Sequence, residues 1–233
     1  MLPSPIPRGS ARRFHLRKVR GRVGLGLVAG LSVLAGMTDA IGFLATGDFV
    51  SFMSGNTTRM AVSLSEGHLA AFGRLALAVL CFVLGNAFGV VVARFSGRRA
   101  APLLAVIATL LAIAALWPFA WRVPAVVLSI LAMGMLNAVV EQVNGLPIGL
   151  TYVTGALSRF GRGLGRWLLG ERREGWRVQL VPWGGMLAGA VLGAFLEFRM
   201  GLLALTFSAG LAALLAIASL WVPRPWQRGY MPR

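Results

Sequence analysis

Six long apolar runs constrain this chain more than any other feature. A bilayer core needs about 20 apolar residues per helix, and six segments meet or approach that length. They are Val23–Ala45, Phe72–Ala93, Ala101–Trp117, Pro124–Val140, Leu180–Phe198 and Leu202–Val222. Only 13% of the 233 residues are charged, whereas soluble domains carry about a quarter, and the mean hydropathy is +0.75. The sequence therefore predicts an all-α, polytopic membrane protein.

Two further segments are too polar to face lipid around their whole circumference. Phe49–Ser65 holds eight Ser, Thr, Asn and Arg residues, and Ile148–Leu164 holds five Ser, Thr and Arg residues together with four glycines. Polar or irregular backbone at membrane depth persists only where protein shields it or where it lines a wet cavity. We therefore expect six transmembrane helices plus two re-entrant or discontinuous segments.

The basic residues predict the orientation of the chain. Seven Lys and Arg residues lie within residues 1–22, and the positive-inside rule places such a tail in the cytoplasm. With six crossings, 19 of the 23 basic residues lie inside and both termini are cytoplasmic. Eight crossings give the same totals but place Arg98 and Arg99 outside. The sequence favours six crossings, with eight as the alternative.

The chain also contains an internal repeat. Gly36–Ala40 recurs as Gly134–Ala138, 98 residues later, and Phe52–Arg59 recurs as Tyr152–Arg159, 100 residues later. A Gly-x-x-x-Gly motif at residues 85–89 recurs 104 residues later, at residues 189–193. Such small-residue faces let membrane helices pack closely, and they permit association into a homo-oligomer.

Three crossings per copy is an odd number, so the second copy lies upside down relative to the first. The sequence thus predicts a 3+3 inverted repeat, an architecture that many transporters share. Its predicted parts are a basic cytoplasmic tail, two membrane repeats and a second cytoplasmic tail, at residues 1–22, 23–122, 123–222 and 223–233. In this arrangement the turns at residues 54–56 and 154–156 approach each other near the middle of the membrane.

Two motifs carry a resemblance to a known family. Gly36–Phe43 followed by Phe49–Arg59 resembles the signature of the YoaK family of bacterial multi-pass membrane proteins. Asn137-Ala138 followed by Thr151–Gly155 resembles that family's second conserved region. The resemblance, which covers Arg22 to Val222, implies a protein of the bacterial inner membrane and supplies no substrate, since the family has no established biochemical function. Ala156 stands where many members have a second Asn, which argues against a symmetric two-Asn gate.

Asp39 is the carboxylate placed deepest in an apolar run. A charge at membrane depth costs about 3 kcal/mol on insertion scales, so Asp39 must face protein, water or a cation. It could relay protons or cations, or pair with Arg59 or Arg159. Alternatively, it accepts hydrogen bonds from backbone amides of the following turn, or bonds to Thr38 and Asn56.

The polar segment from Ser54 to Thr58 predicts a chain break followed by a helix start. A helix that begins deep in the membrane directs its free N–H groups and positive dipole end at what lies there, and Arg59 adds a full charge. This arrangement suits an anionic or strongly polar solute, although the cap and Arg59 could instead only stabilise the fold. The predicted solute pathway consists of Asp39, Ser54, Asn56, Thr57, Arg59, Asn137, Glu141, Thr154 and Arg159.

Other function classes fit the sequence less well. The two histidines, His15 and His68, lie outside the apolar runs, and seven acids are few for metal or acid–base chemistry. We expect no enzyme activity, cofactor, metal or disulfide, the last because Cys81 is the single cysteine. Nucleic-acid binding is disfavoured because the positive charges flank apolar runs instead of covering a solvated face.

Transport therefore remains the favoured function. The expected partners are the lipid bilayer, including anionic lipids near the arginines at residues 159–177, and a small polar or anionic solute. The sequence predicts a small-solute transporter or channel. The alternative is a structural, assembly or sensory component of the membrane that transports nothing.

Overall fold

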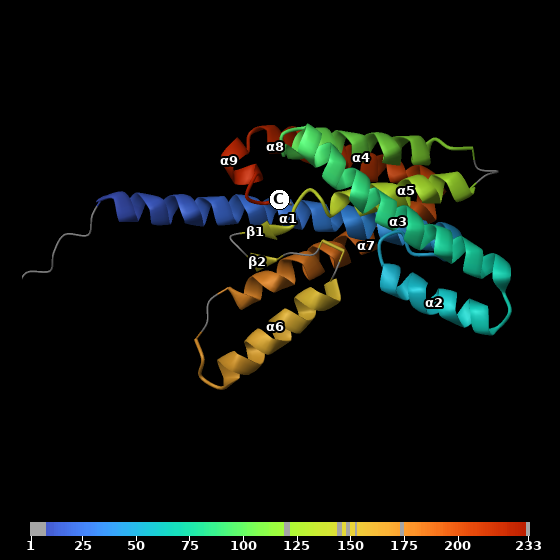
Figure 1. Ribbon diagram of the computed structural model, residues 1–233, viewed down its shortest axis with the longest axis horizontal. Helices are drawn as coiled ribbons and strands as arrows, with labels where there is room; N and C mark the ends of the chain where they lie inside the picture. The colour runs from blue at the N-terminus through green and yellow to red at the C-terminus, as the bar shows by residue number, and fades with distance from the viewer. Residues whose placement is uncertain are drawn as a thin grey trace, which may run out of the picture.

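A computed structural model describes residues 8–118, 122–143, 146–147, 150–151, 153–172 and 175–231 of the chain (Figure 1). These residues form an all-α fold with eight α-helices of 13 residues or more. The helices are α1 (Arg8–Thr46), α2 (Met53–Ser65), α3 (Leu69–Phe95), α4 (Ala100–Ala115), α5 (Arg122–Leu136), α6 (Val153–Leu168), α7 (Leu180–Met200) and α8 (Leu205–Leu220). The smaller elements are β1 (Gln142–Val143), β2 (Leu146–Pro147), η1 (Trp176–Gln179), η2 (Gly201–Ala204) and α9 (Arg224–Gln227).

Three helical segments of the described residues are long and apolar enough to cross a membrane. They are Val19–Thr46, Leu69–Phe95 and Trp176–Leu220. The last holds both α7 and α8, which are joined by η2, whose first residue, Gly201, has φ +59°. Two shorter apolar helices, Ala100–Ala115 and Val123–Leu136, are present as well. The prediction of an all-α protein with membrane-spanning helices is confirmed, whereas the number of six crossings stays a prediction.

The ends of the elements differ from the predicted ranges in an informative way. α1 runs without a break from Arg8 to Thr46, so residues 8–22 of the basic tail and the first apolar run share one helix. α5 ends at Leu136, four residues before the predicted end, because residues 137–139 form tighter turns whose amides bond three residues back. Residues 223–231 fold back onto the bundle, with Gln227 and Tyr230 buried.

Both polar segments are mostly helical. The segment 49–65 consists of the end of an irregular turn, which spans residues 47–52, followed by α2. α6 covers most of the segment 148–164. Residues 148, 149 and 152 lie outside the described residues. Because α2 already begins at Met53, Ser54 and Gly55 belong to its first turn. The predicted break therefore lies several residues earlier than expected.

The two halves of the chain build their helix pairs from equivalent residues. The place where Gly85 would carry a Cβ is filled by the Leu131 carbonyl, so α3 packs directly on the backbone of α5. Gly189 lies 104 residues after Gly85, and the place where it would carry a Cβ is filled by the Val33 carbonyl, so α7 packs directly on the backbone of α1. Val33 precedes Leu131 by 98 residues, which is the offset of the first repeated motif.

The same equivalence holds one turn further along each helix. Gly89 lies against the backbone of Met135, and Gly193 lies against the backbone of Met37. In Figure 1, α1 runs from left to right and its counterpart α5 from right to left. The Gly-x-x-x-Gly faces thus pair helices of different halves, which confirms their predicted packing role.

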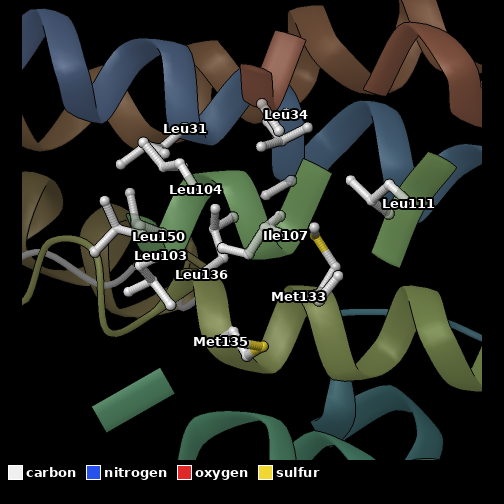
Figure 2. Packing of buried hydrophobic residues seen from close by; sticks show 14 of the residues in the cluster. Leu31, Leu34, Leu103, Leu104, Ile107, Leu111, Met133, Met135, Leu136 and Leu150 are labelled. Atoms are coloured by element: carbon white, nitrogen blue, oxygen red, sulfur yellow. The ribbon is translucent and has the colours of Figure 1, made fainter. Parts of the chain in front are cut away.

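The core lies where α1, α4, α5 and α8 meet. Figure 2 shows Leu31 and Leu34 of α1 above Leu104 and Ile107 of α4, with Met133 of α5 below them. The outward faces of α3 and α7, by contrast, expose large apolar side chains. Examples are Leu80, Val83, Phe88, Leu187, Val191 and Phe195. An apolar outer surface of this kind suits contact with lipid chains.

Candidate functional site

Asp39 anchors the irregular turn that joins α1 to α2. Its Oδ1 atom accepts hydrogen bonds from the backbone N–H groups of Val50, at 2.8 Å, and Ser51, at 2.7 Å. Asp39 is only 7% exposed, so these two bonds satisfy amides that would otherwise be unpaired in a buried place. Of the sequence-based alternatives for Asp39, bonding to the amides of the following turn is confirmed.

Asn56 holds the same turn from the side of α2. Its Oδ1 accepts from the Phe49 N–H at 3.0 Å, while its Nδ2 donates to the Phe49 carbonyl at 2.7 Å. The Asn56 side chain therefore pairs with both backbone groups of Phe49, as a neighbouring strand would. Asn56 is fully buried. Asp39 and Asn56 together fix the three consecutive residues 49–51.

Arg59 does not pair with Asp39. Its partner is Asp48, whose Oδ1 lies 3.1 Å from Nη1 of Arg59, and Arg59 also donates to the Gly47 carbonyl. Asp48 binds a second arginine, Arg74 of α3, through Oδ2. The Asp39–Arg59 pair, one of the alternatives that the sequence left open, is thus wrong, because Asp48 of the irregular turn takes the place of Asp39.

This Asp48 cluster, defined as Asp48, Arg59 and Arg74, is asymmetric in charge and in exposure. The Asp48 side chain is 4% exposed, whereas Arg59 and Arg74 are 43% and 48% exposed. Two arginines share one carboxylate, so the cluster carries a net positive charge. A cavity of about 50 Å³ lies beside it, lined by Thr46, Asp48, Arg74 and apolar side chains of α3 and α5.

The second half repeats part of this arrangement. Asn137, the counterpart of Asp39, accepts a hydrogen bond at 3.1 Å from Thr151, the counterpart of Ser51. Arg159, the counterpart of Arg59, donates to Gln179 of η1 at 2.9 Å. Arg159 is therefore not a partner of Asp39 either. A neutral pair in the second half stands where the first half uses a carboxylate.

The remaining predicted residues are exposed. Ser54 and Thr57 lie on the outer side of α2, where the Thr57 hydroxyl donates to the Met53 carbonyl. Thr154 is exposed on α6, and Glu141 is exposed beyond the end of α5, where its backbone N–H donates to Tyr230. None of these four lies with Asp39 in one cluster.

α2 and α6 rest on different helices. α2 packs on α3, and α6 packs on η1 and α7, so in Figure 1 the two helices diverge from the middle of the molecule. No extensive packing joins α2 to α6 in the described part of the chain. That their first turns meet in one shared site stays a prediction.

Sequence reasoning missed several of the residues that matter here. Asp48 was missed because it lies one residue before the predicted polar segment, which begins at Phe49. Arg74 was missed because it lies inside an apolar run. An arginine within such a run was a signal for a partner, since intramembrane charges pair with one another. Gln179 gave no signal. Among the described residues, no group of three or more His, Cys, Asp or Glu side chains could hold a metal ion.

Comparison with known proteins identifies the family. Residues 27–218 match the family described as "Protein of unknown function (DUF1275)". The chain is 52% identical over 221 residues to a UPF0700 transmembrane protein of Rhizobium meliloti (strain 1021), which covers 94% of this chain and 96% of that relative. No solved structure matches the chain. These matches do not carry the YoaK name, so that resemblance stays a prediction.

The description of this relative as a transmembrane protein agrees with the apolar helices described above. The chain is an integral, multi-pass membrane protein. It belongs to the DUF1275 family of proteins of unknown function.

Proposed function

We propose that the protein is a transporter or channel for small polar or anionic solutes, built as an inverted repeat with six crossings. The observation that carries the proposal is that each half interrupts its membrane bundle with a polar turn tied to an equivalent position. Asp39 binds the turn in the first half, and Asn137 binds Thr151 in the second. Polar backbone at membrane depth is tolerated where it is shielded or lines a wet space.

Two features support the inverted arrangement. The equivalent glycine contacts of α3 on α5 and of α7 on α1 are those expected of two related halves. The opposite directions of α1 and α5 in Figure 1 are those expected when one half is turned over. With six crossings, 19 of the 23 basic residues fall on the cytoplasmic side, in agreement with the positive-inside rule.

The charge of the Asp48 cluster supports a polar or anionic solute. Asp48 neutralises only one of its two arginines, and both guanidinium groups are nearly half exposed. A cationic cluster next to an apolar wall raises the local concentration of anions and repels cations. Under the inverted topology this cluster lies at the outer end of the first re-entrant segment, where a solute would enter.

Liposome swelling tests the proposal without a known substrate. Proteoliposomes and empty liposomes are exposed to osmotic gradients of glycerol, urea, alanine, potassium acetate and potassium chloride, with valinomycin added for the salts. We expect faster swelling with protein for at least one solute. Arg59→Gln should slow anion entry relative to neutral solutes, whereas the exposed Arg94→Gln, remote from the turn, should not.

Asp39→Asn separates charge from structure, because an Asn Oδ1 can accept both backbone hydrogen bonds. Wild-type protein that gives no faster swelling for any of these solutes would exclude transport of them. It would favour the alternative, a structural, assembly or sensory component of the membrane. That alternative agrees with the bonds by which Asp39 and Asn56 hold the turn.

A further inference from the structure

α6 presents two different exposed surfaces to its surroundings. Helical spacing places Leu157, Leu164 and Leu168 in one row, and all three are exposed. A second row consists of Thr154, Ser158, Arg162 and Arg166, and all four are exposed as well. Helical spacing carries this row from beside the leucine row at Thr154 to the opposite side of the helix at Arg166. A helix with one apolar and one basic face is typical of one that lies at a membrane surface.

The third side of α6 is fixed to the rest of the protein. Gly163 lies flush against Trp176, whose ring stands 5.0 Å from that of Phe160. Arg159 donates to the buried Gln179 on the same side. Because these contacts use only one side of α6, they hold both the leucine row and the arginine row outward.

The basic row is specific to the second half. At 100 residues before Arg162 and Arg166, α2 and its end have Val62 and Glu66. The equivalent helix of the first half thus lacks the charges, although it shares the Gly and Arg of its first turns. Arg172 and Arg177 lie exposed beyond the end of α6 and add to its positive charge.

We propose that the arginine row of α6, formed by Arg162 and Arg166, binds the headgroups of anionic phospholipids, while the leucine row lies against their acyl chains. Arginine matches phosphate by charge and by its planar fork of donors. Trp167 lies next to Arg166 and Leu168 in the chain and is 47% exposed, and tryptophan is enriched at the boundary between headgroups and chains. The binding is a property of this surface and does not depend on solute transport.

Lipid titration of the full-length protein in neutral detergent, followed by native mass spectrometry, tests the assignment. Phosphatidylglycerol and phosphatidylcholine are compared for the wild type and for the pair Arg162→Gln/Arg166→Gln. A juxtamembrane arginine changes affinity for an anionic surface by about fivefold, so the pair should weaken phosphatidylglycerol binding by roughly 25-fold at low salt. Binding of phosphatidylcholine should hardly change, and added salt should shrink the difference.

Two further variants make the outcome decisive. Arg94→Gln/Arg99→Gln removes the same charge from exposed positions near the α3–α4 connection and should leave the preference intact. Arg162→Lys/Arg166→Lys keeps the charge and should retain most of the binding. An equal loss in the Arg94/Arg99 pair would mean that net charge alone is responsible, and that result overturns the proposal. So does a wild-type protein without preference for phosphatidylglycerol.

Discussion

Replacing Asp39 with alanine removes the acceptor for two buried backbone N–H groups, those of Val50 and Ser51. Each buried donor left without a partner costs about 1–3 kcal/mol, so Asp39→Ala should lower the free energy of unfolding by about 2–6 kcal/mol. Asp39→Asn keeps an Oδ1 acceptor in the same place. It loses only the extra strength of bonds to a charged group, about 1–2 kcal/mol.

The predicted order is therefore wild type, then Asp39→Asn, then Asp39→Ala. Unfolding in mixed micelles by a titrated denaturing detergent measures the stability of the whole protein. Hydrogen–deuterium exchange followed by mass spectrometry reports on residues 47–52 directly, and peptides from that turn should exchange faster in Asp39→Ala while peptides from α4 remain protected. If alanine leaves both stability and exchange unchanged, Asp39 does not anchor the turn. If asparagine is as damaging as alanine, the negative charge is essential, which the geometry does not require.

Three other perturbations probe features away from the turn. Gly189→Leu should lower the melting temperature by several degrees, because the α1 backbone at Val33 fills the space that a side chain on residue 189 would need. Gly210→Ala, whose methyl group would meet open space, should leave the melting temperature unchanged. Equal melting curves for the two variants would contradict the close packing of α7 on α1. Burial raises the pKa of the Tyr230 hydroxyl, while Arg20 opposes that rise, so Tyr230 stays protonated to higher pH in the folded protein than in the unfolded chain. The resulting contribution to the free energy of unfolding is complete below about pH 10. It is lost as the pH rises through the pKa of Tyr230 in the folded state. Tyr230→Phe should remove that pH dependence from the denaturation midpoint. Gln227→Ala should cost about 2–4 kcal/mol. The Gln227 side chain accepts from the Ala100 N–H at the start of α4 and donates to the carbonyls of Ser219, in the last turn of α8, and Val222, beyond it. Thermal melting that matches the wild type would contradict this prediction.

The apolar runs were sufficient to predict the helices, because a run of that length in lipid has no other way to satisfy its backbone. The glycine motifs were also sufficient to predict close packing. They could not identify the partner helix, since a small-residue face is equally complementary to any neighbouring backbone. That α3 pairs with α5 and α7 with α1 depends on the three-dimensional arrangement of both halves.

The candidate site was harder to predict than the helices. The sequence allowed Asp39 to bind the amides of the following turn, and that contact is present. It also allowed an Asp39–Arg59 pair, which fails because Gly47, with φ +78°, turns the chain so that Asp48 comes within reach of Arg59. Charge pairing between such residues depends on the path of six irregular residues, for which apolar periodicity carries no information.

The crossed pairing of glycine faces has a consequence for how the protein is made. The Gly85 face on α3 packs on α5, and α1 packs on α7, where the paired positions Val33 and Gly189 are 156 residues apart in the chain. When the first half has been synthesised, the packing faces of α1 and α3 therefore still lack their partner helices, which belong to the second half. The close packing of α1 and α3 along these faces can therefore form only after α7 and α5 have been made.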